Sequence, residues 1–205
     1  NSTFTADAAA ASITVNNAGN NFTGTVGFAG AGGLANVTVL DTTALDLGAT
    51  TLTGNLVVTA AGITDSGNLV VGGTTSLTGG GANNIVLDQA GNSFTGAVSV
   101  VSGNNVTLVN SIATDLGAST VSGNLSVTSN GAITDTGALA VTGTTSLTAG
   151  GANDITLNNA NNFGGAVSVV SGNNVTLNDT NAIDLGASTV SGNLVVTAAG
   201  AISDS

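Results

Sequence analysis

The chain has 205 residues, and its only ionisable side chains are 11 aspartates, which give a formal net charge of −11. It contains no Lys, Arg, His, Cys, Met, Trp, Tyr or Pro. Without Lys or Arg the chain cannot neutralise phosphate groups, which excludes nucleic-acid binding. Without Cys or His it has no thiol or imidazole nucleophile and no ordinary zinc site. Because 41% of the residues are apolar, the composition is not that of a disordered chain.

The N-terminal residues 1–11, "NSTFTADAAAA", show little periodicity, and we expect them to form a cap or an extension. No apolar run approaches the roughly 20 residues of a membrane-spanning helix, so no membrane insertion is expected. The final residues "GAISDS" stop where an earlier copy of the same phrase continues. We therefore interpret residues 1–205 as one repetitive segment, excerpted from a longer chain.

An internal repeat dominates the rest of the chain. The phrase "DLGA" recurs around Leu47, Leu116 and Leu185, which gives a 69-residue period. Inside this long repeat lies a shorter unit of about 20 residues that opens with Asn and ends in Gly. The units are 36–54, 55–73, 104–123, 124–143, 153–172 and 173–192. We interpret the long repeat as three such units plus nine additional positions, which either widen one coil or form a loop on it.

Each unit contains short segments such as "NVTL" and "LSVT", in which β-branched residues recur at a spacing of two, and Gly, Asn or Asp separates the segments. A spacing of two is the period of a β-strand, and no segment has the apolar spacing of a helix. Short strands in a coil of about 20 residues predict an all-β, right-handed parallel β-solenoid (β-helix). We expect about eight or nine coils and a length of roughly 40 Å.

Stacked coils place like positions in columns. One predicted column is apolar and points inward, two residues before each coil-ending Gly. It comprises Leu52, Val71, Val101, Val121, Val141, Val170 and Val190. Phe22, Phe94 and Phe163 occur once per long repeat, and we expect them to pack in the core or at corners rather than to stack on a ligand.

A second predicted column is a ladder of asparagines at the corner where each coil opens. Stacked amides can hydrogen-bond up and down such a column. The predicted ladder comprises Asn36, Asn55, Asn83, Asn104, Asn124, Asn153, Asn173 and Asn193. The alternative is that Asn and Gly are merely common turn residues.

The aspartates are the only candidates for chemistry. They occur in pairs separated by about one coil, which predicts two carboxylates close together on adjacent coils. The pairs are Asp46 with Asp65, Asp115 with Asp135, and Asp184 with Asp204. Either they close corners as Asx turns, or each pair helps to hold a Ca²⁺ ion, the one cofactor for which the sequence offers ligands. A polysaccharide hydrolase could use such a pair, but five Phe and no cation make a poor sugar-binding cleft, so we expect no enzyme.

Phrases such as "GNNVTL", "GNLVVTAAG", "ITDTG" and "TTSLTAGG" resemble the repeat shafts of filamentous-haemagglutinin-like adhesins, bacterial proteins exported by two-partner secretion. The resemblance covers nearly the whole chain from about Ser12. It implies a shaft at the bacterial cell surface, outside the cell, and no particular receptor.

The sequence therefore predicts a structural spacer or filament segment of a secreted surface protein. Its expected partners are further repeats or copies of itself, stacked end to end, and host-surface or matrix glycans. The alternative is a glycan-binding or ice-binding solenoid module. An ice binder would need Thr-x-Thr on successive coils, and threonines recur in this way only in some units.

Overall fold

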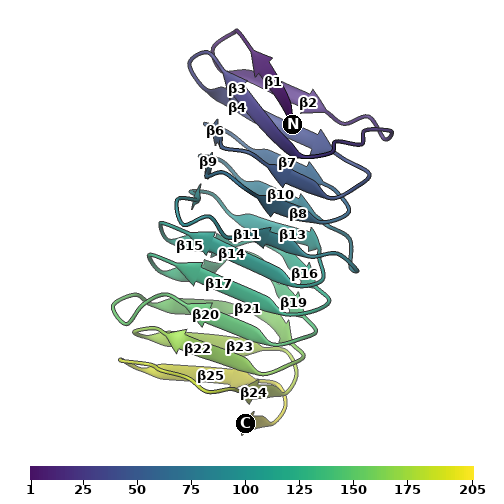
Figure 1. Ribbon diagram of the computed structural model, residues 1–205. Coiled ribbons are helices and arrows are strands. Elements are labelled where there is room, and N and C mark those ends of the chain that lie inside the picture. The colour runs from purple at the N-terminus through teal and green to yellow at the C-terminus, as the bar shows by residue number, and fades with distance from the viewer.

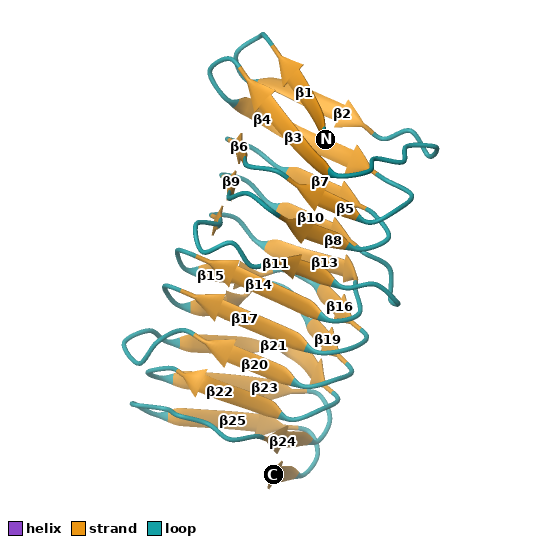
Figure 2. Ribbon diagram, viewed as in Figure 1, coloured by secondary structure: helices purple, strands orange, loops and turns teal.

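The computed structural model describes residues 1–205 and contains 26 strands and no helix (Figure 2). All strand pairs are parallel, and successive turns of the chain stack into an elongated solenoid (Figure 1). Strands form where residues that suit the core alternate with small polar ones, as in β17 (Leu125–Ser129), where buried and more exposed residues alternate. No segment forms a helix of the length and apolar character needed to cross a membrane.

Two long sides of the solenoid face each other across the core. The first sheet has eleven strands. They are β1 (Ser2–Ala6), β3 (Thr25–Gly30), β5 (Leu45–Leu47), β8 (Ile63–Asp65), β11 (Ile85–Leu87), β14 (Val106–Asn110), β17, β20 (Thr145–Thr148), β22 (Val167–Ser171), β24 (Ile183–Leu185) and β26 (Ile202–Asp204). Eleven stacked strands correspond to about ten turns, slightly more than the eight or nine predicted.

The second sheet has 15 strands, and ten of them form the opposite long side. These ten are β2 (Ala11–Val15), β4 (Leu34–Leu40), β7 (Leu56–Thr59), β10 (Thr75–Thr78), β13 (Val98–Ser102), β15 (Thr114–Leu116), β18 (Ile133–Asp135), β21 (Ile155–Phe163), β23 (Val175–Asp179) and β25 (Leu194–Ala198). The prediction of a parallel β-solenoid with short, regular coils is confirmed. Residues 1–11 contribute β1 and the first residue of β2, so they belong to the first turn.

The 69-residue repeat makes three and a half turns. From β5 to β24 the first sheet advances by seven strands, and Leu45 and Ile183, which begin these strands, are two long repeats apart. The copy of β5 in the intervening repeat is β15, which lies in the second sheet. The nine additional positions are therefore neither a loop nor a widening of one coil. They supply half a turn: residues 144–152 contain the regular strand β20.

The solenoid has a short third side, which changes from one edge to the opposite edge between the first long repeat and the second. In the early turns it consists of β6 (Thr50–Leu52), β9 (Leu69–Val71) and β12 (Ser93–Phe94), which lie along one edge. In later turns it consists of β16 (Ser119–Val121), β19 (Leu139–Val141) and the end of β21, along the opposite edge (Figure 1). Because both long sides face the same core, the same apolar pattern can serve either sheet after half a turn.

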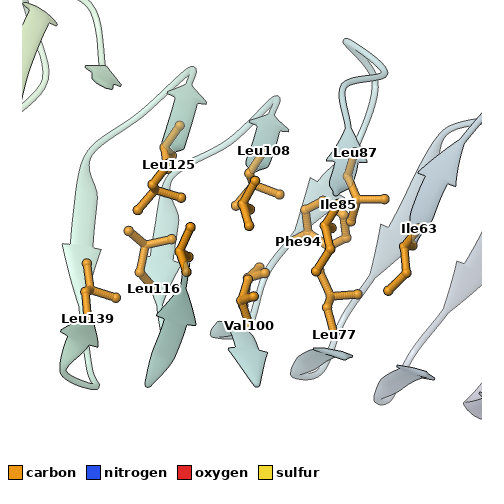
Figure 3. Close-up of a cluster of buried hydrophobic side chains, with 14 of the residues drawn as sticks. Ile63, Leu77, Ile85, Leu87, Phe94, Val100, Leu108, Leu116, Leu125 and Leu139 are labelled. Carbon is orange, nitrogen blue, oxygen red and sulfur yellow. The ribbon is translucent and has the colours of Figure 1, made fainter. Parts of the chain in front are cut away.

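A single hydrophobic core of 39 buried residues runs through the solenoid. Leucine, isoleucine and valine side chains from facing strands meet along the axis, as Leu77, Ile85, Leu108 and Leu125 illustrate in Figure 3. Phe94 and Phe163 are fully buried, and Phe22 packs edge-on against Phe4 with ring centroids 5.6 Å apart. The aromatic residues therefore serve packing, as expected.

The predicted inward column is wrong at two positions. Leu52, Val71, Val121 and Val141 are buried, and Val190 is partly buried, whereas Val101 and Val170 are 56% and 53% exposed. The register of β13 and β22 shifts just there, by a bulge opposite the ends of β10 and β20. Strand alternation places Val101 and Val170 outward, because the residue before each of them, Val100 or Val169, faces inward. After the bulge, Gly103 and Gly172 are in register with Val121 and Val190, so the glycines take the inward positions of the column.

Candidate functional site

Hydrogen-bonded ladders run along the corners that precede the long strands. In each ladder the side-chain oxygen of one turn accepts the backbone N–H of the next turn. Asn36 Oδ1 accepts from Asn55 N at 2.8 Å, and Asn55 Oδ1 accepts from Thr74 N at 2.8 Å. The side chains thus bond to the backbone of the neighbouring turn rather than mainly to each other, which fixes the spacing and register of successive corners.

The ladder continues as two further, separate runs. In the second run Asn84 Oδ1 accepts from Asn105 N, Asn105 Oδ1 from Asn124 N, and Asn124 Oδ1 from Thr144 N. In the third run Asp154 Oδ1 accepts from Asn174 N, and Asn174 Oδ1 from Asn193 N, at 3.0 and 3.1 Å. The first and third runs precede strands of the second sheet, whereas the second run precedes strands of the first.

The eight predicted asparagines therefore do not form one column, because the half-turn moves the corner to the other edge. Asn36, Asn55, Asn124 and Asn193 occupy ladder positions. Asn104 and Asn173 lie beside the ladder and donate through Nδ2 to Asn84 and Asp154. Asn83 and Asn153 donate within their own turns, to the carbonyls of Gly79 and Ala149. Where the chain reads Asn-Asn or Asn-Asp, the second residue makes the ladder bond.

The members of each predicted aspartate pair lie on opposite faces of their strands. Asp46 is in register with Thr64, and Asp65 with Leu47. The second pair repeats this arrangement, because Asp115 is opposite Thr134 and Asp135 is opposite Leu116. The third pair does so too, with Asp184 opposite Ser203 and Asp204 opposite Leu185.

The prediction of adjacent carboxylates is therefore wrong, and the reason is turn length. In each pair the two aspartates are one residue farther apart in sequence than the length of the turn between their strands. The second aspartate therefore lies one residue beyond the register partner of the first. A shift of one residue moves a side chain from the outer face to the inner face. No group of three or more aspartates gathers where it could hold a metal ion.

The outward aspartates accept hydrogen bonds from hydroxyl groups of neighbouring turns. Asp46 Oδ2 accepts from Thr25 Oγ1 at 2.7 Å and from Ser66 Oγ at 2.8 Å. Asp115 Oδ2 accepts from Thr136 Oγ1 at 2.9 Å, and Asp184 Oδ2 accepts from Ser205 Oγ at 2.9 Å. These carboxylates connect turns at the surface, where hydroxyl donors take the place of the cations that the chain lacks.

The inward aspartate Asp65 is buried in a polar network at a corner. Its Oδ2 accepts from Asn92 Nδ2 at 2.6 Å, and its Oδ1 accepts from Asp88 N at 3.0 Å. Asn92 Oδ1 in turn accepts from Leu69 N at 2.8 Å. Asn92 is 0% exposed, so its amide joins a buried carboxylate to a buried backbone donor.

The same network recurs one long repeat later on the opposite sheet. Asp135 Oδ2 accepts from Asn161 Nδ2 at 2.8 Å, and Asn161 Oδ1 accepts from Leu139 N at 2.8 Å. The carboxylate also accepts from the backbone N–H groups of Asn158 and Asn159 at 3.0 and 3.2 Å. The two networks thus place a carboxylate and an amide together in the interior of each full repeat.

Two aspartates have shifted pKa values. Burial raises the pKa of Asp65 above its ordinary value, hydrogen bonds from Asn92 and Asp88 oppose the rise, and the Asp88 charge adds to it. Hydrogen bonds from the backbone and side chain of Asn174 lower the pKa of the exposed Asp154, with a smaller contribution from Asn173. The first carboxylate is therefore placed at an electrostatic cost, and the second is stabilised in its ionised form.

Sequence reasoning missed five buried polar residues, of which only Asn92 and Asn161 belong to these two networks. The five are Asp41, Asn92, Asn110, Asn161 and Asp179. Asp41, Asn110 and Asp179 are one long repeat apart, and Asn92 and Asn161 each stand two residues before a core phenylalanine. The recurrence of Asn-x-Phe was the available signal, but it could not show which polar side chain turns inward.

Two surface hollows occupy equivalent places in successive repeats. The first, of about 530 Å³, is lined by Ala49, Thr51, Asn68 and Val70 together with part of the segment 28–33. The second, of about 420 Å³, is lined by Val101, Ala118, Thr120, Ala138 and Ala140, among others. No aspartate lines either of them.

Three segments of the chain, 34–101, 103–170 and 172–205, match the model of a family described as repeats of unknown function (DUF5649). The chain belongs to this family. Its first two DUF5649 units end at Val101 and Val170, the exposed valines at the bulges of β13 and β22. No curated protein and no solved structure matches the chain significantly.

Proposed function

We propose that this DUF5649 chain is a structural spacer: a shaft segment of a secreted bacterial surface protein, as in the filamentous-haemagglutinin-like adhesins that its repeats resemble. The observation that carries the proposal is the unbroken stacking of the turns. Parallel ladders join β1 to β26 and β2 to β25, and one core runs along the axis. Each repeat therefore adds about 17 Å of rod, since three and a half turns stack at about 4.8 Å.

The surface chemistry supports a spacer outside the cell. The chain offers no Lys or Arg for trypsin-like cleavage, and its ordered corners present few loops. We propose no catalytic role, because the aspartates that would form an acid–base pair project from opposite faces of their strands. Ca²⁺ binding stays a hypothesis that thermal melting in Ca²⁺ against EDTA, at constant ionic strength, would test.

We also propose end-to-end continuation. In the last turn, residues of β25 and β26 such as Leu194 and Ile202 are 45% and 53% exposed. The corresponding residues one turn earlier, Val175 and Ile183, are 1% exposed. A further turn, from more repeats or from a second copy, would cover the exposed residues and pair the open strand edges.

The spacer function is tested by measuring length and location. Electron microscopy of parent proteins that carry different numbers of units should show a rod that lengthens by about 17 Å per unit. Antibodies against the repeat should label intact cells without permeabilisation. A length that does not change with unit number, or label that appears only in permeabilised cells, would contradict the proposal.

The alternative, a glycan-binding or ice-binding module, has one favourable observation. Thr107, Ser126, Ser146 and Ser168 follow one another in register on the outer face of the first sheet, one hydroxyl per turn. Specific binding on a glycan array, or inhibition of ice recrystallisation, that is lost on substitution of Ser126 and Ser146 by Asp would favour this function over a spacer.

A further inference from the structure

The chain contains a single Asn-Gly pair, Asn130–Gly131, at the corner between β17 and β18. The equivalent corners of the first and third repeats read Ala61–Gly62 and Ala199–Gly200, so the asparagine is peculiar to the second repeat. Its side chain is exposed and takes no part in the ladders or in the interior networks. The stacking of the turns therefore gives this side chain no role.

The backbone nitrogen that follows Asn130 is also free. Asn130 N donates to Asn110 O at 3.0 Å, but the N–H of Gly131 donates to no backbone or side-chain oxygen. At the equivalent corner of the third repeat, Gly200 N does donate, to Asn181 O at 2.8 Å. Gly131 has no Cβ to shield its nitrogen. An unbonded side-chain amide thus precedes an unbonded and unhindered backbone nitrogen.

We propose that Asn130 is a site of spontaneous deamidation. The Gly131 nitrogen loses its proton to solvent base and bonds to Cγ of Asn130, while the side-chain amide nitrogen takes up a proton and leaves as ammonia. The product is a five-membered succinimide ring. Water then opens the ring: cleavage at the side-chain carbonyl gives aspartate, and cleavage at the main-chain carbonyl gives isoaspartate. Overall, one water is consumed and one ammonia is released, without an oxidant or a cofactor.

Asn68 shows why exposure alone does not make such a site. This residue is also exposed, and its side chain also makes no hydrogen bond. It is followed, however, by Leu69, which is 0% exposed and whose N–H donates to Asn92 Oδ1 at 2.8 Å. The nitrogen that would have to attack is therefore held in the interior, so Asn68 is a matched control for Asn130.

The two products should differ in their effect on the corner. Aspartate keeps the backbone and adds one charge at an exposed position. Isoaspartate adds one carbon atom to the main chain, where neighbouring turns already lie close together: a Cβ on Gly131 would be 2.7 Å from Ala113 N. The longer main chain displaces Gly131 or breaks the bond from Asn130 N to Asn110 O, two residues before the buried Ile133. Isoaspartate therefore loosens this corner.

Incubation of the whole folded chain at physiological temperature, at neutral and mildly alkaline pH, tests this inference. Intact mass measures deamidation, an isoaspartyl methyltransferase labels isoaspartate, and fragmentation in the mass spectrometer gives the position. Nearly all of the label should lie at Asn130 and should increase with pH, because base removes the Gly131 proton. Asn130→Ala, which introduces the residue of the equivalent corners, should lose the label, and Asn68→Ala should retain it.

Label that is spread over many asparagines, or that persists in Asn130→Ala, would overturn the inference. A parallel sample in urea separates the folded corner from the bare sequence. Modification of Asn130 that occurs only in urea would show that the fold prevents the reaction, and would overturn the inference as well.

Thermal melting tests the loosened corner. Asn130→Asp contains the aspartate product alone and should melt like the wild type. The aged chain should show an additional fraction that melts earlier and that matches its isoaspartate content. An aged chain that contains isoaspartate and melts in one transition with Asn130→Asp would contradict this effect on the corner.

Discussion

The buried networks around Asp65 and Asp135 are the same device, one repeat apart and on opposite sheets. In both, a carboxylate stacks beside a leucine and bonds to a fully buried asparagine. They differ in two neighbours: Asp88 and Gln89 stand in the first network where Asn158 and Asn159 stand in the second.

The charged one of these two neighbours, Asp88, changes the electrostatics of the first corner. The Asp88 charge adds to the burial that raises the pKa of Asp65. In the second network the Asp135 carboxylate also accepts the backbone N–H of Asn159 at 3.2 Å. In the first network the corresponding backbone hydrogen bond, from Gln89, lowers the pKa of Asp65 less than the hydrogen bonds from Asn92 and Asp88 do. Identical folding of two repeats therefore does not require identical electrostatics, because the backbone and the asparagine keep the corner in place in both.

Removing the central asparagine should have the largest effect. Asn92→Ala or Asn161→Ala takes a hydrogen-bond partner from a buried carboxylate and from a buried backbone N–H, which should cost about 3 kcal/mol of the free energy of unfolding. Urea unfolding measures the loss. Asn158→Ala, which keeps its backbone N–H, is the matched control and should change stability little. Equal losses in the control and the buried variants would show that the amide bridge is unimportant.

The glycine two residues after each inward aspartate should be nearly as sensitive. A Cβ on Gly67 or Gly137 would run into the backbone nitrogen of Ala49 or Ala118 in the preceding turn. Gly67→Ala and Gly137→Ala should each destabilise by about 2 kcal/mol, because the adjacent backbones must separate. Gly27, which has open space around it, is the control. The prediction fails if Gly27→Ala lowers the melting temperature as much as Gly137→Ala.

A buried threonine in each region offers a gain in stability. The hydroxyls of Thr75 and Thr145 have no hydrogen-bond partner, and both residues are 1% exposed. Each is in register with apolar residues of the turns on either side. Thr75→Val and Thr145→Val should each stabilise by about 1 kcal/mol in urea unfolding. Exposed Thr74→Val should not stabilise, and a loss at position 145 would reveal a buried water that satisfies the hydroxyl.

The smallest expected effect tests the difference between the two networks directly. Because the pKa of Asp65 is raised in the folded state, folding takes up a proton as the pH falls from above that pKa to the ordinary aspartate range. This residue therefore contributes a gain in stability on mild acidification. Asp88→Asn gives the first network the neighbour of the second and should reduce this gain by less than about 0.5 kcal/mol.

Urea unfolding of the wild type and Asp88→Asn at neutral pH and near pH 4 would measure the change. Asp154→Asn is an opposite control, since the lowered pKa of Asp154 contributes stability above the ordinary aspartate range that is lost as the pH falls. A pH dependence that Asp88→Asn leaves unaltered, or that it strengthens, would separate Asp88 from the pKa of Asp65.

The sequence pattern was enough to predict the parallel solenoid, the 69-residue period, the approximate length of a turn and most of the apolar inward positions. These follow from local alternation and from recurrence, which a linear pattern shows directly. It also identified corners rich in asparagine, although it chose Asn83 and Asn153 where Asn84 and Asp154 form the ladder.

The register of the strands and the half-turn depend on contacts between distant parts of the chain, which the sequence pattern does not show. Inner and outer faces of a strand alternate every residue, so an error of one position in the length of a turn moved Asp65 and Asp135 from a predicted surface pair into the core. Likewise, a repeat of three turns plus nine residues has the same 69-residue period as a repeat of three and a half turns. The two differ only in which sheet receives the next repeat, and pairing between distant strands decides that.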